Sequence, residues 1–162
     1  MTRHWGAVLS ALLLLELSTT GAHATGDQSV GATAVWGQPD FTTVGHQCNH
    51  PTSMTLCGPT QAVADAQGNL WVADHVHNRI LMFPRGRAIA SKVFGQYGSM
   101  STHGCDQVPP KGSPYPPAPN RYTLCRPAGI AIDQTGTLYV ADSLNSRVLV
   151  FFHAAQKPAA AP

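Results

Sequence analysis

Residues 127–151 read PAGIAIDQTGTLYVADSLNSRVLVF, and residues 59–83 read PTQAVADAQGNLWVADHVHNRILMF. The two stretches align without a gap at an offset of 68 positions, because residue 127 matches residue 59. Upstream, Val-x-Gly-Gln at 35–38 recurs at 93–96, and Thr-Leu-Cys at 55–57 recurs at 123–125. A self-match of this length indicates a duplicated structural unit of the kind found in repeat proteins.

Each copy alternates short apolar runs with turn residues, which is typical of antiparallel strands. In the second copy we expect strands at Gly129–Asp133, Leu138–Ala141 and Arg147–Phe152, and the first copy has counterparts beginning at Gln61, Leu70 and Arg79. Segments 34–38 and 92–96 are expected to supply fourth strands. The pattern therefore predicts an all-β protein with two four-stranded antiparallel blades of a β-propeller.

The pattern Pro-x-Gly-Ile-Ala-Ile-Asp-x-x-Gly-x-Leu-Tyr-Val-Ala-Asp-x-x-Asn-x-Arg-Val at Pro127–Val148 resembles an NHL repeat. The resemblance covers both copies, and the chain is similar to exported bacterial NHL-repeat proteins with cysteine-bearing loops. It implies a partial propeller, because members of this family usually form six blades. Some relatives, such as peptidylglycine amidating lyase and paraoxonase-like enzymes, are catalytic. The motif itself specifies a blade far more strongly than a function.

The first copy departs from the family pattern along its first strand. Where the family has Gly-Val-Ala-Val-Asp, this chain has Gln-Ala-Val-Ala-Asp at 61–65. Large and small residues are exchanged there, so we expect either a poorer core face or a shifted register.

Residues 1–24 have the features of a secretory signal peptide. Arg3 and His4 give a basic start, residues 7–15 form an apolar run, and Ala-His-Ala at 22–24 is a small-x-small cleavage motif. The apolar run is shorter than the about 20 residues that a membrane helix needs. We therefore expect a protein secreted to the extracellular space or the cell envelope, with no membrane span in the mature chain.

The rest of the chain is predicted to hold two NHL-type repeats within residues 25–154, at about 33–92 and 93–154. An Ala/Pro-rich disordered tail is expected at 155–162. The formal net charge is only +2, and the lysines and arginines do not cluster. This distribution argues against a nucleic-acid-binding surface.

Four cysteines in an exported chain favour disulfides, and four allow three connectivities. Each copy has one pair with matching flanks, which favours Cys48 with Cys57 and Cys105 with Cys125. A zinc site made from the four thiols is less favoured, because the close Cys-x-x-Cys spacing is missing.

Asp74 and Asp142 end the second strand of each copy, and Arg79 and Arg147 follow five residues later. Such a carboxylate can accept backbone N–H groups of the turn and pair with the arginine, and Asn145 can serve the same turn. A residue that recurs in every blade is part of the blade, so the interpretation is structural. The alternative is an acidic ring that binds a cation such as calcium.

Histidines are weak candidates for a metal site. His75 and His77 lie in one turn, and imidazole is a common zinc ligand. The pair aligns with Ser143 and Asn145, so it is not part of the repeat. We expect no cofactor, with zinc or calcium as the alternative.

The stretch 108–122 carries six prolines and offers Tyr115, Tyr122 and Arg121 as candidate partner-binding residues. Proline-rich segments favour extended conformations that can present aromatic side chains. The alternative is an insertion tolerated at a blade edge. Four aromatic residues fall on matching strand positions and are expected to pack in the core or between blades; they are Trp36, Trp71, Phe94 and Tyr139.

Two blades are too few to close a propeller, which normally needs about 4–8. The expected strand order leaves the last blade without a closing strand, while the N-terminal part offers a spare one. We therefore expect a non-catalytic binding or scaffold module that is completed by further blades or by self-assembly, for example a trimer with six blades. Its ligand would be a protein or a glycan. The alternatives are an incomplete relative of metal-dependent propeller lyases or hydrolases, and a carbohydrate-binding propeller.

Overall fold

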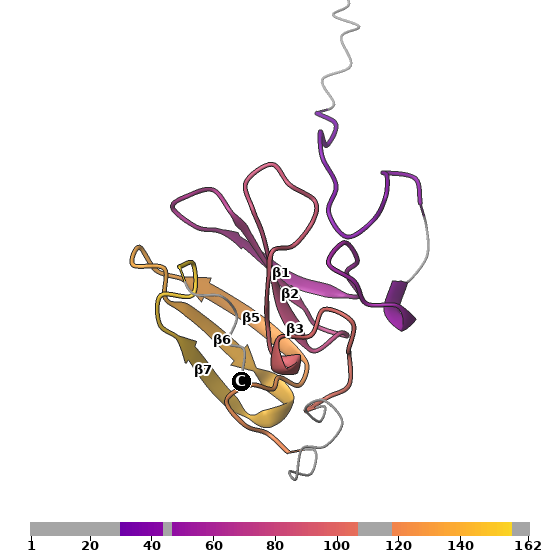
Figure 1. Ribbon diagram of the computed structural model, residues 1–162. Coiled ribbons are helices and arrows are strands. Elements are labelled where there is room, and N and C mark those ends of the chain that lie inside the picture. Colours follow the sequence, from indigo (N-terminus) through magenta and orange to yellow (C-terminus); the bar gives the residue numbers. More distant parts are fainter. Residues whose placement is uncertain (1–29, 44–46, 107–117, 157–162) are drawn as a thin grey trace, which may run out of the picture. The chain divides into compact units, whose positions relative to one another are not determined.

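The computed structural model describes residues 30–43, 47–106 and 118–156 (Figure 1). Contacts divide the chain into residues 1–31 and residues 32–162, and every described strand belongs to the second unit. The predicted signal peptide at 1–24 and positions 157–162 of the predicted tail lie outside the described residues. In the described part of the chain, no helix is long and apolar enough to cross a membrane.

The first copy of the repeat forms a four-stranded antiparallel sheet with the order β1-β2-β3-β4. Its strands are β1 (Pro59–Ala64), β2 (Leu70–Asp74), β3 (Arg79–Phe83) and β4 (Lys92–Phe94). In the β3–β4 pair, Leu81 lies opposite Val93. The segment predicted as a fourth strand at 92–96 thus closes the first sheet, and β4 spans the predicted boundary between the repeats.

The second copy forms a three-stranded antiparallel sheet with the order β5-β6-β7. Its strands are β5 (Pro127–Ile132), β6 (Leu138–Asp142) and β7 (Arg147–Phe151). In the first sheet, β4 pairs with the edge of β3 that faces away from β2. Among the described residues, no strand pairs with the equivalent edge of β7. The described part of the second blade thus lacks its closing strand, as the expected strand order indicates.

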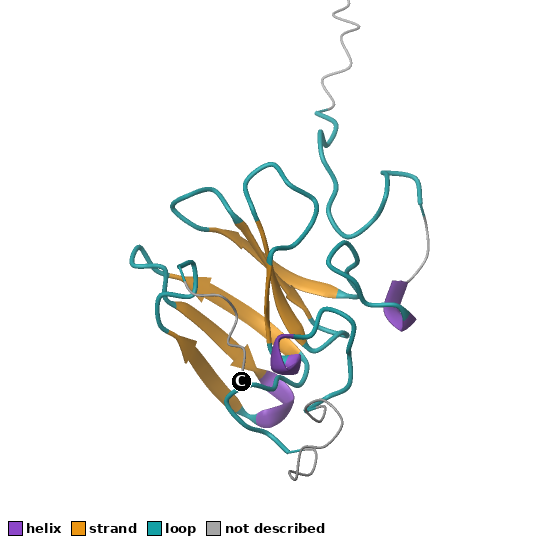
Figure 2. Cartoon of the chain, viewed as in Figure 1, coloured by secondary structure: helices purple, strands orange, loops and turns teal. Residues whose placement is uncertain are grey.

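The described part of the chain also has three short 3₁₀ turns, which lie in the loops before and between the strands (Figure 2). The turns are η1 (Gln47–Asn49), η2 (Gln96–Gly98) and η3 (Ser143–Asn145). An aspartate shapes the first hairpin of each sheet. Asp65 Oδ1 accepts the backbone N–H of Asn69 at 2.8 Å, and Asp133 Oδ1 accepts that of Thr137 at 2.9 Å. Because an aspartate in a turn hydrogen-bonds the backbone that follows it, both copies make the same hairpin.

The two sheets share one hydrophobic core. Its buried members come from β2 to β6 and from the chain that precedes β5 or follows β7; they are Trp71, Ala73, Ile80, Met82, Phe94, Leu124, Ile130, Leu138, Val140 and Ala154. Half-buried Leu149 and Phe151 of β7 pack against this core. The Phe94 and Phe151 rings lie 5.1 Å apart at an interplanar angle of 70°. This edge-to-face contact joins β4 of the first sheet to β7 of the second.

A smaller core covers the opposite face of the first sheet. Its buried members are Val72, Leu81, Phe83, Ala90 and Val93. Four partly buried side chains pack against them: Trp36, Leu56, Leu70 and Met100. Since successive strand residues point to opposite faces, the first sheet is covered on both of its sides.

Segment 34–38, which was predicted as a strand, forms none. A strand needs a neighbouring sheet edge, and the edge of β3 is already taken by β4. The segment lies instead against the first sheet, where Trp36 Nε1 donates to the Arg87 carbonyl at 2.8 Å and the Gly37 carbonyl accepts the N–H of Leu56 at 3.4 Å. The prediction of a strand here is therefore wrong for the single chain.

The first strand of the first copy keeps the register of its counterpart, so the alternative of a shifted register is wrong. Gln61 lies opposite Ala73, as Gly129 lies opposite Ala141. The polar side chain found in place of glycine has a specific partner, because Gln61 Oε1 accepts the backbone N–H of Ile130 at 2.7 Å. This bond joins the two sheets.

Candidate functional site

A buried ion pair lies at the end of β2. Asp74 Oδ2 is 2.8 Å from Arg79 Nε, and both side chains are fully buried. Asp74 Oδ1 accepts the backbone N–H of Cys57 at 2.7 Å. One carboxylate therefore joins β2, β3 and the chain that leads into β1.

The second sheet repeats this arrangement. Asp142 Oδ2 accepts hydrogen bonds from Arg147 Nε at 2.7 Å and from Asn145 Nδ2 at 2.9 Å. Asp142 Oδ1 accepts the backbone N–H of Cys125 at 2.6 Å. The turn prediction placed the backbone donors within the turn after the strand, but in both sheets the Oδ1 donor is the cysteine that precedes the first strand. The reason is spatial, because that cysteine lies beside the end of the second strand.

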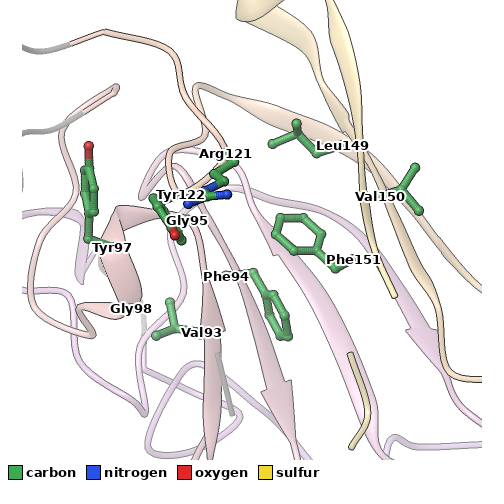
Figure 3. A pocket seen from close by; sticks show the side chains of 10 residues that line it. All are labelled: Val93, Phe94, Gly95, Tyr97, Gly98, Arg121, Tyr122, Leu149, Val150 and Phe151. Carbon is green, nitrogen blue, oxygen red and sulfur yellow. The ribbon is translucent and has the colours of Figure 1, made fainter. Parts of the chain in front are cut away.

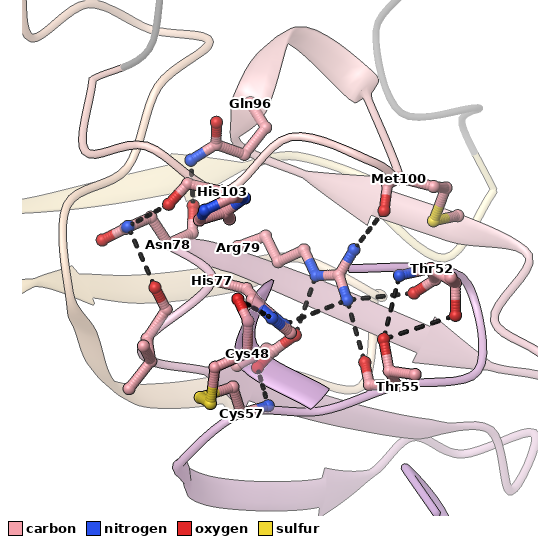
Figure 4. Close-up of polar contacts among 12 residues, drawn as sticks. Cys48, Thr52, Thr55, Cys57, His77, Asn78, Arg79, Gln96, Met100 and His103 are labelled. Carbon is pink, nitrogen blue, oxygen red and sulfur yellow. Dashed lines mark hydrogen bonds and ion pairs between the residues drawn. A yellow bond between two sulfur atoms is a disulfide. The ribbon is translucent and has the colours of Figure 1, made fainter. Parts of the chain in front are cut away.

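The Arg79 guanidinium connects two loops through three carbonyl groups (Figure 4). Nη1 donates to the Met100 carbonyl at 2.6 Å, and Nη2 donates to the carbonyls of Thr52 and Thr55 at 3.0 and 2.8 Å. Burial lowers the pKa of Arg79 below its ordinary value, while Asp74 acts in the opposite direction. The group is a structural cation at the end of the first blade where β2 ends and β3 begins.

His77 occupies the place that Asn145 has in the second copy. Its Nδ1 lies 2.8 Å from Asp74 Oδ2, and its Nε2 lies 3.2 Å from the Cys48 carbonyl. His75 Nδ1 lies 3.2 Å from the Pro127 carbonyl. Both ring nitrogens of His77 thus have partners within the blade. Figure 4 shows His77 together with Cys48.

One group of three potential metal ligands occurs in the described part of the chain, and it consists of Cys105, Asp106 and Cys125. The two cysteines are bonded to each other, so they do not offer thiolates to an ion. The other disulfide joins Cys48 and Cys57. Both disulfides have the pairing within one copy that the matching flanks favoured.

A pocket of about 240 Å³ lies between β4 and β7 (Figure 3). β4 and the following turn contribute Val93, Phe94, Gly95, Tyr97 and Gly98; the chain before β5 contributes Arg121 and Tyr122; and β7 contributes Leu149, Val150 and Phe151. We call this pocket the strand slot. It runs along the edge of β7 with which no described strand pairs.

Arg121 and Tyr122, two of the predicted partner-binding residues, line the strand slot. The guanidinium of Arg121 lies 4.8 Å above the Tyr122 ring, and the Tyr97 and Tyr122 rings are 5.7 Å apart. A cation over an aromatic face and two neighbouring rings give the slot an aromatic wall with one positive charge. The third predicted residue, Tyr115, lies outside the described residues.

The first sheet has the same slot, but there it is filled. β4 pairs with Leu81 and Met82, which match Leu149 and Val150 at the offset of 68. Just before β4, the Ser91 N–H donates to the Met82 carbonyl at 2.9 Å. In the second sheet the corresponding edge borders the pocket.

The chain that enters β4 also has equivalent surroundings. The Ala90 N–H donates to the Ser53 carbonyl at 2.8 Å, and Ser53 matches Arg121 at the offset of 68. Trp36, which matches Phe94, donates to the carbonyl of Arg87. The walls of the strand slot are therefore the counterparts of groups that hold residues 87–93 in the first sheet.

One face of the second sheet is apolar and exposed, and we call it the outer face. Its large side chains and their exposed fractions are Tyr139 39%, Val148 64% and Val150 41%. Their counterparts at the offset of 68 are buried; these are Trp71 0%, Ile80 0% and Met82 5%. The difference arises because the second sheet covers the first, and no described residues cover the second in the same way.

Of the four aromatic residues expected to pack, Trp71 and Phe94 are buried and Trp36 is half-buried, whereas Tyr139 is exposed. Sequence reasoning missed Tyr97 as part of the slot. Its counterpart at the offset of 58 is Pro39, so the repeat gave no aromatic signal at this position.

None of the curated proteins matches the sequence. The family model of the NHL repeat matches residues 124–151. The matched stretch contains all three strands of the second sheet, from β5 to β7. Residues 124–151 therefore match an NHL repeat, and the first copy has the same strand register as this stretch.

Proposed function

We propose that the chain is a non-catalytic binding module of the propeller type and that it binds an extended polypeptide segment along β7. One observation carries this proposal: the strand slot has the walls that hold β4 in the first sheet, and it has no strand in it among the described residues. An unpaired strand edge is a template for another strand. Main-chain hydrogen bonds then supply affinity, and side-chain pockets supply specificity.

The lining of the slot favours a segment with large apolar side chains. Val93 and Phe94 of β4 pack into the two cores of the first sheet, so a strand on β7 would present similar residues. Arg121 lines the slot and favours a ligand without a positive charge next to it. Aromatic side chains and arginine are the residue types enriched at protein interfaces.

A metal-dependent lyase or hydrolase has less support. The buried ionisable groups Asp74, Arg79, Asp142 and His77 hold the blades together, and each is hydrogen-bonded within its own sheet or loops. A carbohydrate ligand is supported only by the neighbouring rings of Tyr97 and Tyr122. A peptide ligand has the stronger basis, because the equivalent position beside β3 in the first sheet is filled by the strand β4.

We further propose that the protein is exported. Two disulfides support this, since disulfides persist in oxidising compartments outside the cytosol. The sequence pattern of residues 1–24 gives the route.

A peptide with the sequence of residues 87–95, which fill the slot of the first sheet, tests the proposed function. We expect the labelled peptide to bind the Ala34→Pro variant in fluorescence anisotropy, because proline keeps segment 34–38 of the chain itself from pairing as a strand. A matched peptide with serine at the positions of Val93 and Phe94 is expected to bind at least tenfold more weakly. Equal binding of the two peptides, or of neither, would contradict strand capture.

A further inference from the structure

We propose that the strand that fills the slot is segment 34–38 of a second copy of this chain, which adds to β7 head to tail. This inference rests on the proposed function and names its ligand. It is carried by one juxtaposition: among the described residues, β7 has an unfilled strand position, and segment 34–38 is a copy of the fitting strand that belongs to no sheet.

The unpaired segment matches the strand that fills the first slot. Val-Trp-Gly-Gln at 35–38 corresponds to Val-Phe-Gly-Gln at 93–96, and the latter begins within β4. The two glycines have the same backbone conformation, since φ is 87° at Gly37 and 86° at Gly95. A Cβ built on Gly37 would meet the side chain of Leu56, and one built on Gly95 would meet that of Leu124. Leu56 and Leu124 are themselves counterparts, so the segment already has the local shape that follows β4.

Segment 34–38 also lies against the first sheet in the position that a strand closing a neighbouring sheet would take. Trp36 and Leu56 pack against the smaller core of the first sheet. In the same way, Phe94 and Leu124 belong to the core that the two sheets share. In the chain, Phe94 belongs to the strand that closes one sheet and lies against the next sheet. Trp36 therefore lies where a strand closing a preceding sheet would lie, and a second copy can supply that sheet without a rearrangement of the segment.

The repeat offsets fix the register of the contact. In the first sheet Ile80 lies opposite Phe94, and Met82 lies opposite Lys92. Shifting the first member by 68 and the second by 58 places Val148 opposite Trp36 of the second copy. The same shift places Val150 opposite Ala34 of the second copy.

The exposure of side chains on the outer face also indicates that a second copy packs against the second sheet. Its exposed residues Tyr139, Val148 and Val150 match residues that the second sheet buries in the first. Large contiguous apolar patches on a soluble protein mark interaction sites. The sheet-on-sheet contact that the chain makes once internally would be made again between copies, with the first sheet of one copy covering the outer face of the other.

Such a contact uses different surfaces on the two copies, so it continues until a ring closes. Three copies contain six sheets, which lies within the about 4–8 blades that close a propeller. We therefore infer a closed trimer.

Two variants separate the surfaces that give and receive the strand. Val148→Lys with Val150→Lys places charges on the receiving edge, where lysine is known to block strand pairing. Ala34→Pro alters the exposed residue that begins the giving segment, where proline disfavours a strand position within a sheet. A matched control, Ile89→Lys with Leu144→Lys, adds the same charge at exposed apolar residues outside the slot and the outer face.

Light scattering at micromolar concentration should give a trimer for the wild-type protein and for the control. Each interface variant should be a monomer, and an equimolar mixture of the two should give a dimer, because one intact giving segment meets one intact receiving edge. The Ala34→Pro variant should also bind the 87–95 peptide, whereas the double-lysine variant should not. A wild-type monomer that binds the peptide would overturn the homotypic contact and leave strand capture standing. Failure of Ala34→Pro to bind the peptide would overturn strand capture itself.

Discussion

The Asp74→Asn substitution should destabilise the protein far more than Asp142→Asn. Asp74 faces a fully buried arginine, whereas the arginine partnered by Asp142 is 25% exposed. Removing one partner of a buried pair leaves an uncompensated charge and costs about 3–5 kcal/mol. At the exposed pair water can reach the guanidinium, so the loss should be near that of one charged hydrogen bond, about 1.5–3 kcal/mol.

Urea unfolding followed by tryptophan fluorescence measures both losses. A single domain has a total stability of about 5–15 kcal/mol, so Asp74→Asn should remove a large part of it. With a slope of about 1–3 kcal/mol per molar urea, the midpoint should fall by roughly 2 M for this variant. Asp142→Asn is the matched control, because it makes the same chemical change at the equivalent position. Equal losses in the two variants, or a loss below about 1 kcal/mol for Asp74→Asn, would refute the role of burial in this argument.

Three further predictions follow from the blades. Reduction of both disulfides should lower the unfolding free energy by about 3 kcal/mol for each bridge, since the closed loops are short, and denaturation with and without a reductant measures this. Burial acts to raise the pKa of Asp65, but hydrogen bonds led by that from Trp71 outweigh it and lower the pKa below its ordinary value. The stability that this carboxylate contributes is thus present above the ordinary pKa of about 3.9 and is lost as the pH falls through the lowered pKa. Thermal melts across this pH range should show a weaker pH dependence for Asp65→Asn than for the wild type. Gly95→Ala should cost more than Gly86→Ala, because both have positive φ but only Gly95 lies against other atoms; melting temperatures that fall equally would contradict this.

The sequence predicts the blades well because the repeat encodes local structure. Turn aspartates and alternating apolar residues set the hairpins, and the match between copies indicates which cysteines pair. The strand at 92–94 was found for the same reason. Each of these features depends on residues within one copy.

Features that depend on a neighbouring sheet could not be found in this way. Segment 34–38 matches a strand but lies beside a sheet whose β3 edge β4 already occupies, and Tyr139 matches Trp71 but has no sheet of described residues over it. The sequence aligned His77 with Asn145, but the contact of the imidazole with Asp74, which parallels that of Asn145 with Asp142, is evident only in the structure. The strand slot likewise emerges only once β4 and β7 lie side by side.

The most direct test of the strand slot is a disulfide between copies. Ala34→Cys and Val150→Cys in one chain place thiols at positions that the register sets opposite each other, within the reach of a disulfide. Under mild oxidation, non-reducing electrophoresis should show covalent dimers and a ladder that ends at three chains. Ala34→Cys with Val148→Cys is the control, because the diagonal distance of about 7–8 Å is too long for a bridge. Equal cross-linking of the two variants, or none in either, would contradict addition of this segment to β7.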